Sequence, residues 1–341
     1  MQAIKELSLK ELKEITDSWG KPEFHAHQIW NWIYKKNVTD FEKMSDLPLD
    51  LRRQLKENFS LANLKLVEVV TSKDQTKKFL FELNDGNFIE AVIIPAKERI
   101  TGCISTQVGC KFSCQFCASG LLGFKRNLSY GEIIDEVLSL KASSQKLTNL
   151  VFMGIGEPLD NYDQVLKVVK TVNSPLALNL GARKITISTC GIIPGIKRLA
   201  EEGLQIELSV SLHAANEKIR NRLMPVNKKY PIKDLMGACR EYIKKTNRQI
   251  TFDYILINKL NSSLKDAQEL SLLLKEIKLS KVNLIPANQI KELEIEPPPE
   301  SEISSFKNYL DKAGIKVALR RPRGQDIKAA CGQLRLSTMI S

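Results

Sequence analysis

The sequence has no run of about 18 uncharged apolar residues, the length that a helix needs to cross a membrane. Its first residues, Met-Gln-Ala-Ile-Lys-Glu-Leu-Ser, lack the basic and then apolar arrangement of a signal peptide. We therefore expect a cytoplasmic protein that does not bind membranes. In a reducing compartment, its seven cysteines are expected to act as ligands, catalysts or packing residues and not as a disulfide scaffold.

The chain has 341 residues, of which 43% are hydrophobic, enough for one large domain with an appendage. Its net charge of +12 favours a polyanionic partner. Basic residues crowd two stretches, first Lys228, Lys229, Lys233, Arg240, Lys244, Lys245 and Arg248, then Lys316, Arg320, Arg321, Arg323 and Lys328. The first stretch fits solvated helix faces and RNA contact equally well. The second lies beside Cys331, an expected catalytic residue, and we expect it to contact an anionic substrate.

A short loop between Gly109 and Ala118 carries Cys110, Cys114 and Cys117 at the spacing C-x3-C-x2-C. Iron–sulfur clusters are usually held by four cysteines, so three thiolates can bind three corners of a cubane and leave one iron open to a small ligand. Structural zinc usually needs a fourth Cys or His at short spacing, and none lies in the loop or soon after it. The spacing favours a [4Fe-4S] cluster over structural zinc or cysteines that are merely buried.

Strand-like and helix-like segments alternate from residue 100 onward, the pattern of parallel βα units. The expected strands are 101–107, 149–155, 184–189, 206–212, 250–257 and 281–286, and the expected helices are 130–144, 162–173, 194–202, 231–246 and 264–277. Six units are fewer than the eight of a closed barrel, so we expect an α/β fold with an open, partial (βα)6 barrel. The cysteine loop follows the first strand and should lie at the carboxyl ends of the strands, where substrates bind.

Four regions are expected along the chain. Residues 1–62 are predicted to form a helical N-terminal domain that helps to bind RNA, and 63–98 a β-hairpin, turned at Asn84-Asp85-Gly86, that docks on a larger sheet. The partial barrel covers 99–290. The C-terminal extension, 291–341, contains a last helix at 301–313, a last strand at 315–320 and Cys331.

The expected strand ends carry glycine or polar residues, in the runs Met153–Pro158, Ile187–Gly191, Ser209–His213 and Ile285–Asn288. Glycines there would let a ligand approach the backbone, and Glu157 can accept hydrogen bonds from an ammonium group. Together these strand ends suit a zwitterionic nucleoside such as S-adenosylmethionine (SAM). Cys331 lies in a polar loop whose basic neighbours would favour its thiolate, whereas Cys190 and Cys239 are expected to be packing residues.

The whole chain resembles the RlmN/Cfr family of radical-SAM RNA methyltransferases, and its RlmN branch more closely. The motifs that carry the resemblance are Ile89–Val92, Cys103–Cys110, the three-cysteine loop, Met153–Pro158, Ser211–His213, Lys281–Pro286 and Arg323–Leu334. The resemblance implies methylation of C2 of an adenine in 23S rRNA near the peptidyl-transferase centre, and of an anticodon-loop adenine in tRNA. It also implies a [4Fe-4S] cluster, SAM and an electron donor such as flavodoxin or ferredoxin. No oligomer is indicated, so a monomer is expected.

The family's reaction scheme implies roles for individual residues. Cys331 would take a methyl group from one SAM, and a deoxyadenosyl radical from a second SAM would abstract a hydrogen from that methyl. After the methyl carbon adds to the adenine, Glu90 would remove the C2 proton and Cys103 would release the RNA by forming a disulfide with Cys331, which requires a Cα separation below about 7 Å. The expected SAM contacts are Gly156, Glu157, Ser188, Ser211, His213, Asn288 and the backbone of Leu212.

Three alternatives remain open from the sequence. The nearest is a Cfr-like enzyme that methylates C8 of the same rRNA adenine. A radical-SAM enzyme acting on a protein or small molecule would not need the pair Cys103 and Cys331, and a non-enzymatic iron–sulfur assembly factor would bind RNA without modifying it. The segment after Asn288 lacks the proline-rich run of many relatives, which weakens the expected backbone contact to SAM there.

Overall fold

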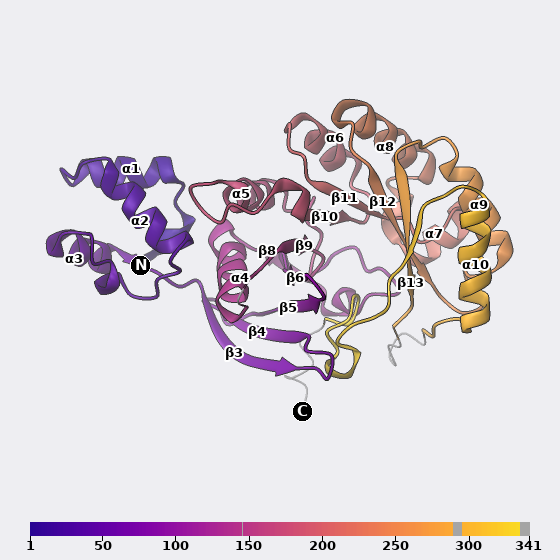
Figure 1. The fold of residues 1–341 in the computed structure, drawn as a ribbon, viewed down its shortest axis with the longest axis horizontal. Helices are drawn as coiled ribbons and strands as arrows, with labels where there is room; N and C mark the ends of the chain where they lie inside the picture. The colour runs from indigo at the N-terminus through magenta and orange to yellow at the C-terminus, as the bar shows by residue number, and fades with distance from the viewer. Residues whose placement is uncertain (145, 289–294, 335–341) are drawn as a thin grey trace.

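The computed structural model describes residues 1–144, 146–288 and 295–334 (Figure 1). The segment after Asn288 whose composition differs from that of many relatives lies outside these residues.

A ten-stranded sheet in the order β14-β13-β12-β11-β10-β9-β6-β5-β4-β3 forms the body of the protein. Seven neighbouring strands of this sheet are parallel: β6 (Arg99–Cys103), β9 (Asn149–Phe152), β10 (Ile185–Thr189), β11 (Glu207–Ser211), β12 (Ile250–Leu256), β13 (Ser280–Pro286) and β14 (Val317–Leu319). The first six match the predicted strands, so the expected partial (βα)6 barrel is confirmed. The predicted last strand, 315–320, is shorter in the structure and extends the parallel sheet.

Helices connect the parallel strands and cover the outside of the open barrel (Figure 1). They are α4 (Tyr130–Ser143), α5 (Tyr162–Asn173), α6 (Ile193–Glu201), α7 (Glu217–Leu223), α8 (Ile232–Thr246), α9 (Leu264–Leu274) and α10 (Glu300–Lys312). Each long helix turns its apolar residues toward the sheet, as Val165, Val168 and Val172 of α5 show, being almost fully buried.

The predicted hairpin is part of the barrel sheet and has a third strand. β3 (Leu64–Thr71), β4 (Lys77–Leu83) and β5 (Phe88–Ala96) are antiparallel, and β5 pairs with β6 in antiparallel register. The open barrel leaves one edge of β6 without a parallel neighbour, and β5 satisfies its backbone hydrogen bonds. The turn at Asn84-Asp85-Gly86 forms where it was expected, and Gly86 has a φ of +76° that favours glycine.

Three helices form the N-terminal unit, α1 (Leu9–Ser18), α2 (Phe24–Tyr34) and α3 (Leu49–Asn58), accompanied by the short strands β1 (Gln2–Ala3) and β2 (Phe59–Ser60). The unit lies at the far side of α4 from the barrel strands (Figure 1). Tyr34 Oη lies 2.9 Å from Tyr130 Oη, and the Asn63 amide donates to Asp135 at 2.6 Å. α4 is therefore the element that joins the N-terminal unit to the barrel. Within the described residues, no helix has the length and apolar character to cross a membrane.

After β14 the chain crosses the front of the sheet to the β3–β4 turn (Figure 1). There the Gly324 amide donates to Asp74 Oδ2 at 3.0 Å, and Ser72 Oγ donates to Asp326 Oδ1 at 2.5 Å. The chain then reaches the cysteine loop. We call residues 324–334 the Cys331 segment.

Candidate active site

One cavity, of about 980 Å³ including the space open to solvent, lies at the carboxyl ends of the parallel strands. Its walls include the three loop cysteines, Cys331 and five predicted SAM contacts: Cys110, Cys114, Cys117, Cys331, Gly156, Glu157, Ser188, Ser211 and His213. These residues come from five separate segments of the chain. Parallel strands place their carboxyl ends at one edge, and this is why the residues meet.

Two short strands, β7 (Gln107–Gly109) and β8 (Phe124–Asn127), frame the cysteine loop. Gly109 has a φ of +74°, and a Cβ on it would lie 1.6 Å from the Gly123 carbonyl oxygen, so only glycine fits there. Within the loop, the Cys117 amide donates to the Cys114 carbonyl at 3.1 Å, and the Gln115 amide donates to the Leu223 carbonyl of α7 at 2.9 Å. The loop is thus attached to the barrel on two sides.

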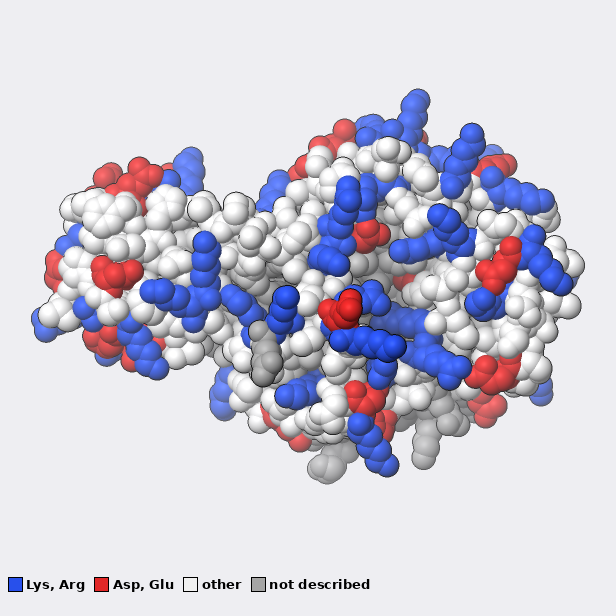
Figure 2. Space-filling model, viewed as in Figure 1, with Lys and Arg blue, Asp and Glu red and all other residues white. Residues whose placement is uncertain are grey.

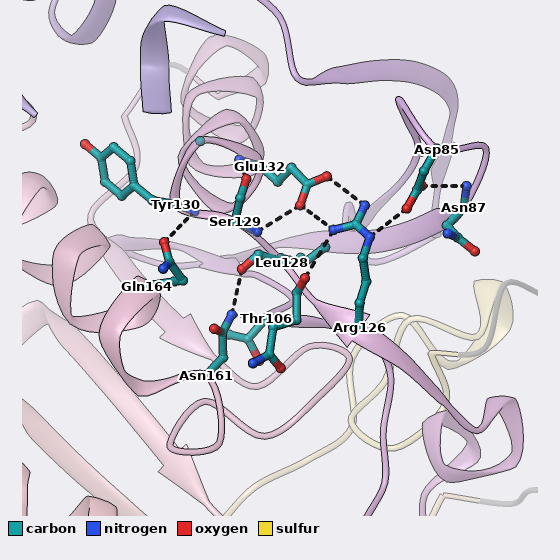
Figure 3. A network of polar contacts seen from close by, with 12 residues as sticks. Asp85, Asn87, Thr106, Arg126, Leu128, Ser129, Tyr130, Glu132, Asn161 and Gln164 are labelled. Atoms are coloured by element: carbon teal, nitrogen blue, oxygen red, sulfur yellow. Dashed lines mark hydrogen bonds and ion pairs between the residues drawn. The ribbon is translucent and has the colours of Figure 1, made fainter. Parts of the chain in front are cut away.

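A polar network fastens the base of this loop to two other elements (Figure 3). Arg126 of β8 makes two 2.8 Å hydrogen bonds to the Glu132 carboxylate and one of 2.6 Å to Asp85 in the β4–β5 turn. Glu132 also accepts from the Ser129 amide at 2.9 Å as part of the capping box that begins α4. Asn161 donates to carbonyls on both sides of the loop, those of Thr106 and Leu128.

The thiols of the loop are enclosed. Burial raises the pKa of Cys110 to about 12, and burial together with Cys117 and Cys110 raises the pKa of Cys114 well above its usual value. In the described parts of the chain, no three His, Cys, Asp or Glu residues lie close enough to share one metal ion. A cubane cluster takes one thiolate per iron, so thiols spread around a cavity wall suit it. The donor set fits a [4Fe-4S] cluster.

Two glycines of the Met153–Pro158 run are required by packing. A Cβ on Gly154 would lie 2.6 Å from the Ile104 carbonyl oxygen, and one on Gly156 would lie 2.6 Å from Gln107 Cβ. Ligand approach, the role expected for these glycines, is therefore not the only reason for them, because Ile104 and Gln107 already fill the space beside them. Gly156 still lines the cavity.

Glu157 is 4% exposed, and its carboxylate accepts from the Cys190 amide at 2.7 Å and from the Leu159 amide at 3.0 Å. Burial raises its pKa, although these hydrogen bonds oppose the shift. Leu212, predicted to contribute its backbone, is fully buried, and its amide and carbonyl already bond to Asp253 and Arg220.

His213 lies just beyond β11 with a φ of +58°. Its Nδ1 accepts the Ile255 amide at 3.0 Å, and its ring meets Phe116 edge-on at 4.5 Å. Burial first, and then the charge of Arg220, lower its pKa to about 3. The imidazole is therefore neutral with its proton on Nε2, a hydrogen-bond donor in the cavity wall.

Cys331 is exposed to the cavity and also borders a second, smaller cavity of about 390 Å³. Its segment is held by the cysteine loop, since the Ala118 amide donates to the Gly332 carbonyl at 2.7 Å and Ser119 Oγ to the Leu334 carbonyl at 2.9 Å. Asn288, predicted to contact SAM, donates to the Cys331 carbonyl at 2.9 Å. Its amide group thus links β13 to the Cys331 segment.

As expected, a basic neighbour favours the Cys331 thiolate, because Arg320 lowers the pKa of that thiol, but the protein packed around the thiol has the larger and opposite effect. Burial raises the pKa of Cys331, and Arg320 only opposes that shift. Cys103 is 8% exposed, and burial first, then Cys331, raise its pKa to about 12. The two residues are free thiols that are near enough to affect each other's ionisation.

Glu90 and Cys103 lie outside the walls of the larger cavity, and Cys103 lies near enough to Cys331 for that residue to raise its pKa. Glu90, Val92 and Cys103 share one face of the sheet, because Val92 pairs with Cys103 in register and side chains alternate along a strand. Val92 and Cys103 pack there against Ala329 of the Cys331 segment. Glu90 is fully buried, with its Oε1 3.0 Å from Lys78 Nζ.

Sequence reasoning missed Arg320 and Asp253 as cavity residues. Asp253 accepts from Ser209 at 2.6 Å and from Asn283 at 2.8 Å, and burial raises its pKa. Arg320 follows β14 and was expected, as one of the second basic stretch, to contact an anionic substrate, but it was not singled out as part of the cavity wall. The one available signal was the alternation of side chains between the two faces of the sheet along the last strand. That strand is too short to show which face Arg320 lies on.

Lys and Arg side chains surround a hollow on the face shown in Figure 2. Of the second basic stretch, Arg320 and Arg323 border the smaller cavity beside Cys331. In the first stretch, Arg240, Lys245 and Arg248 form ion pairs with Glu276, Glu201 and Glu207. Because these charges are already paired, solvated helix faces explain the first basic stretch better than RNA contact does.

A partial barrel whose first strand leads into a loop with three cysteines defines the radical SAM enzymes, which use a [4Fe-4S] cluster and SAM. The sequence model of the radical SAM superfamily matches residues 104–270. A second model, of the ribosomal RNA large subunit methyltransferase N-terminal domain of RlmN, matches residues 3–61.

Full-length relatives narrow this class to one family. A probable dual-specificity RNA methyltransferase RlmN from Caldanaerobacter subterraneus subsp. tengcongensis is 47% identical over 98% of each chain. A namesake from Geobacillus kaustophilus is 48% identical over 98% of this chain and 93% of its own length. The crystal structure of a radical SAM methyltransferase from Sphaerobacter thermophilus has a TM-score of 0.95 and 41% identity, over 98% of this chain and 99% of that one. The chain belongs to the RlmN family of radical SAM RNA methyltransferases.

Proposed function

We propose that this protein methylates C2 of an adenine in 23S rRNA near the peptidyl-transferase centre, and an anticodon-loop adenine of tRNA. The observation that carries the proposal is the position of Cys331, in the wall of the cavity that also holds the three loop cysteines and the strand-end residues. The printed names of the relatives, dual-specificity RNA methyltransferases, support two RNA substrates.

The chemistry of the target explains why a thiol is needed. C2 of adenine lies between two ring nitrogens and is electron-poor, so it cannot attack the methyl group of a sulfonium as an ordinary nucleophile does. When bound, the cluster and SAM supply the methyl group, one electron and radical chemistry that abstracts hydrogen. Cys331 accepts the methyl group first, forming its S–C bond as the sulfonium bond breaks. Arg320, beside it in the cavity wall, stabilises the attacking thiolate.

The later steps use the face of β5 and β6 that the Cys331 segment covers. Once hydrogen is abstracted from the methyl group on Cys331, its carbon, now a radical, adds to C2 and joins protein to RNA. The adduct must then lose one electron, which the oxidised cluster would accept when bound. Glu90, whose carboxylate is held in place by an ion pair with Lys78, then removes the C2 proton. The Cys103 thiolate attacks the Cys331 sulfur, and a disulfide forms as the bond between that sulfur and the bridging carbon breaks. The freed carbon takes up a proton and becomes the methyl group of the RNA, and a two-electron reductant restores both thiols.

The partners follow from this chemistry. We assign RNA binding to the N-terminal unit and to the basic residues beside Cys331. The protein acts in the cytoplasm, where ribosomes and tRNA are found. A low-potential one-electron protein such as flavodoxin or ferredoxin reduces the cluster. The four regions proposed from the sequence, 1–62, 63–98, 99–290 and 291–341, stay a prediction.

Replacing Cys331 by Ala tests the function directly. Mass spectrometry of 23S rRNA and tRNA from cells that carry only the variant should find no C2-methyladenine, because the methyl acceptor is gone. Cys239→Ala, a change at a fully buried cysteine of α8, is the matched control and should keep the modification. RNA affinity should change little in Cys331→Ala. A C8-methylated product from the parent would favour the Cfr-like alternative, and RNA that is bound but never modified would favour an assembly factor.

A further inference from the structure

Arg220, on α7, is the largest side chain that is completely buried in the described part of the structure. A buried guanidinium loses its hydration, which is costly unless nearby groups compensate its charge. The residue plays no part in the chemistry proposed for the methyl transfer, so the reason for its charge has to be sought in its surroundings.

Its hydrogen bonds all go to neutral oxygens. The acceptors are the carbonyls of Leu212 (3.1 Å), Cys190 (2.9 Å) and Ser211 (3.2 Å) and the side-chain amide oxygen of Asn227 (2.5 Å). No ion pair to Arg220 is found among the described residues, and Glu217 is reached only through Asn227. Burial lowers the pKa of Arg220, but a guanidinium remains protonated in proteins. Its hydrogen bonds are satisfied, yet its charge is not paired locally.

The surroundings of Arg220 place it behind the cysteine loop. Its carbonyl acceptors lie at the ends of β10 and β11, which line the main cavity. Leu223, at the other end of α7, accepts the Gln115 amide from within the loop at 2.9 Å. Cys114 packs against Cys190 and Leu223 in one apolar cluster. One short helix therefore fixes both the guanidinium and the loop.

The charge of Arg220 acts inside the cavity. It lowers the pKa of His213, a residue of the cavity wall. An enclosed, weakly polar site screens charges poorly, so such interactions remain strong there. A [4Fe-4S] cluster with three thiolates would place negative charge in this site, and one-electron reduction adds one more.

We propose that Arg220 is a positioning residue whose buried positive charge compensates the cluster and makes its one-electron reduction easier. Reduction potentials of iron–sulfur clusters follow net charge and hydrogen bonding around the sulfurs. The electron comes from a low-potential donor, and the added negative charge on the cluster is stabilised by the guanidinium. The inference concerns the cluster and not the RNA, so it stands or falls independently of methyl transfer.

The test measures the midpoint potential of the cluster by EPR-monitored titration with dithionite in anaerobically reconstituted protein. Arg220→Gln should shift the potential to more negative values, whereas Arg220→Lys, which keeps the charge, should stay close to the parent. Arg222→Gln removes an exposed charge from the same helix and should leave the potential unchanged. Iron content confirms that each variant is loaded. An unshifted Arg220→Gln, or equal shifts in the Gln and Lys variants, would overturn the proposal.

A second variant covers the case in which Arg220→Gln does not fold. Asn227→Asp places a carboxylate where Arg220 already donates its shortest hydrogen bond, and so compensates the guanidinium without removing it. The potential should again move to more negative values. A potential equal to that of the parent in this variant would show that charge at this position does not reach the cluster.

Discussion

At the scale of single residues, the reactivity of Cys331 depends on two opposing influences. Burial raises its pKa, and Arg320 lowers it. Only the thiolate is nucleophilic, and a raised pKa keeps most of the thiol protonated at neutral pH. Methyl acceptance should therefore become faster as pH rises through the neutral range.

Replacing Arg320 by Gln should displace this pH profile to higher pH and slow methyl acceptance at neutral pH, because the opposing charge is lost. The rate of S-methylation of the Cys331 peptide, followed by mass spectrometry at several pH values without RNA, measures the effect. Arg321→Gln removes the neighbouring exposed charge and serves as the control. If the two variants had the same profile, Arg320 would not act on the thiol.

Single residues also show which functional roles can be predicted from the sequence and which cannot. The three loop cysteines could be found because their spacing is local. Arg220 and Arg222 are two residues apart on one helix, and nothing nearby in the sequence distinguishes them. The role of Arg220 depends on carbonyls of β10 and β11, which only the folded sheet brings to it.

At the scale of elements, the frame around the cysteine loop controls how well the site is formed. Arg126→Gln should lower the iron content of reconstituted protein, because β8 loses its ties to α4 and to the β4–β5 turn. The expected loss of unfolding free energy is about 1 kcal/mol, since the Arg126 side chain is 34% exposed.

Iron per protein and the visible absorbance of the cluster measure this effect, with chemical denaturation for stability. Lys125→Gln removes an exposed charge and one hydrogen bond to Asn87 of the β4–β5 turn but leaves the ties to α4, so it is the control for the α4 ties. Iron content in Arg126→Gln equal to that of the control would mean that the loop does not need this frame.

The contact between the β3–β4 turn and the Cys331 segment should depend on pH. Burial would raise the pKa of Asp74, but hydrogen bonds from Thr76 and Gly324 outweigh it and hold the pKa at about 2. A carboxylate whose pKa is lowered by folding stabilises the fold above its unfolded value of 3.8, and this contribution is lost as pH falls through about 2.

The difference in unfolding free energy between the parent and Asp74→Asn should therefore be about 2 kcal/mol near pH 5 and shrink as pH falls toward 2. Urea denaturation at a series of pH values measures it. Asp85→Asn is a second test of the same linkage and not a neutral control, because the hydrogen bond from Arg126 lowers the pKa of Asp85 below its usual value and should give a pH-dependent difference as well. If the difference in unfolding free energy between the parent and Asp74→Asn did not change with pH, the lowered pKa of Asp74 would be contradicted.

At the scale of the whole molecule, the barrel could be predicted from the sequence because each strand and helix repeats a local pattern. The predicted strand at 149–155 ends at Phe152, since Met153–Pro158 turns across the barrel mouth instead of continuing the sheet. The joining of β5 to β6 could not be read from the hairpin signal, which says only that β4 and β5 pair.

The cavity also needed the fold. The alternation of strands and helices predicted that the cysteine loop and the strand ends meet at one edge, but nothing in the order of the sequence showed that Cys331 joins them there. The resemblance to known enzymes named the residues, and the structure adds how the chain holds them, through Asn288, Ala118 and Ser119 on the Cys331 segment.

The attachment of the Cys331 segment to the cysteine loop has a consequence for biosynthesis. Translation proceeds from the amino end, so the loop and most of the barrel leave the ribosome before Gly332 and Leu334 are made. The Ala118 and Ser119 contacts can form only after that. A nascent chain therefore lacks both Cys331, the proposed methyl acceptor, and these two contacts to the cysteine loop until synthesis has passed Leu334.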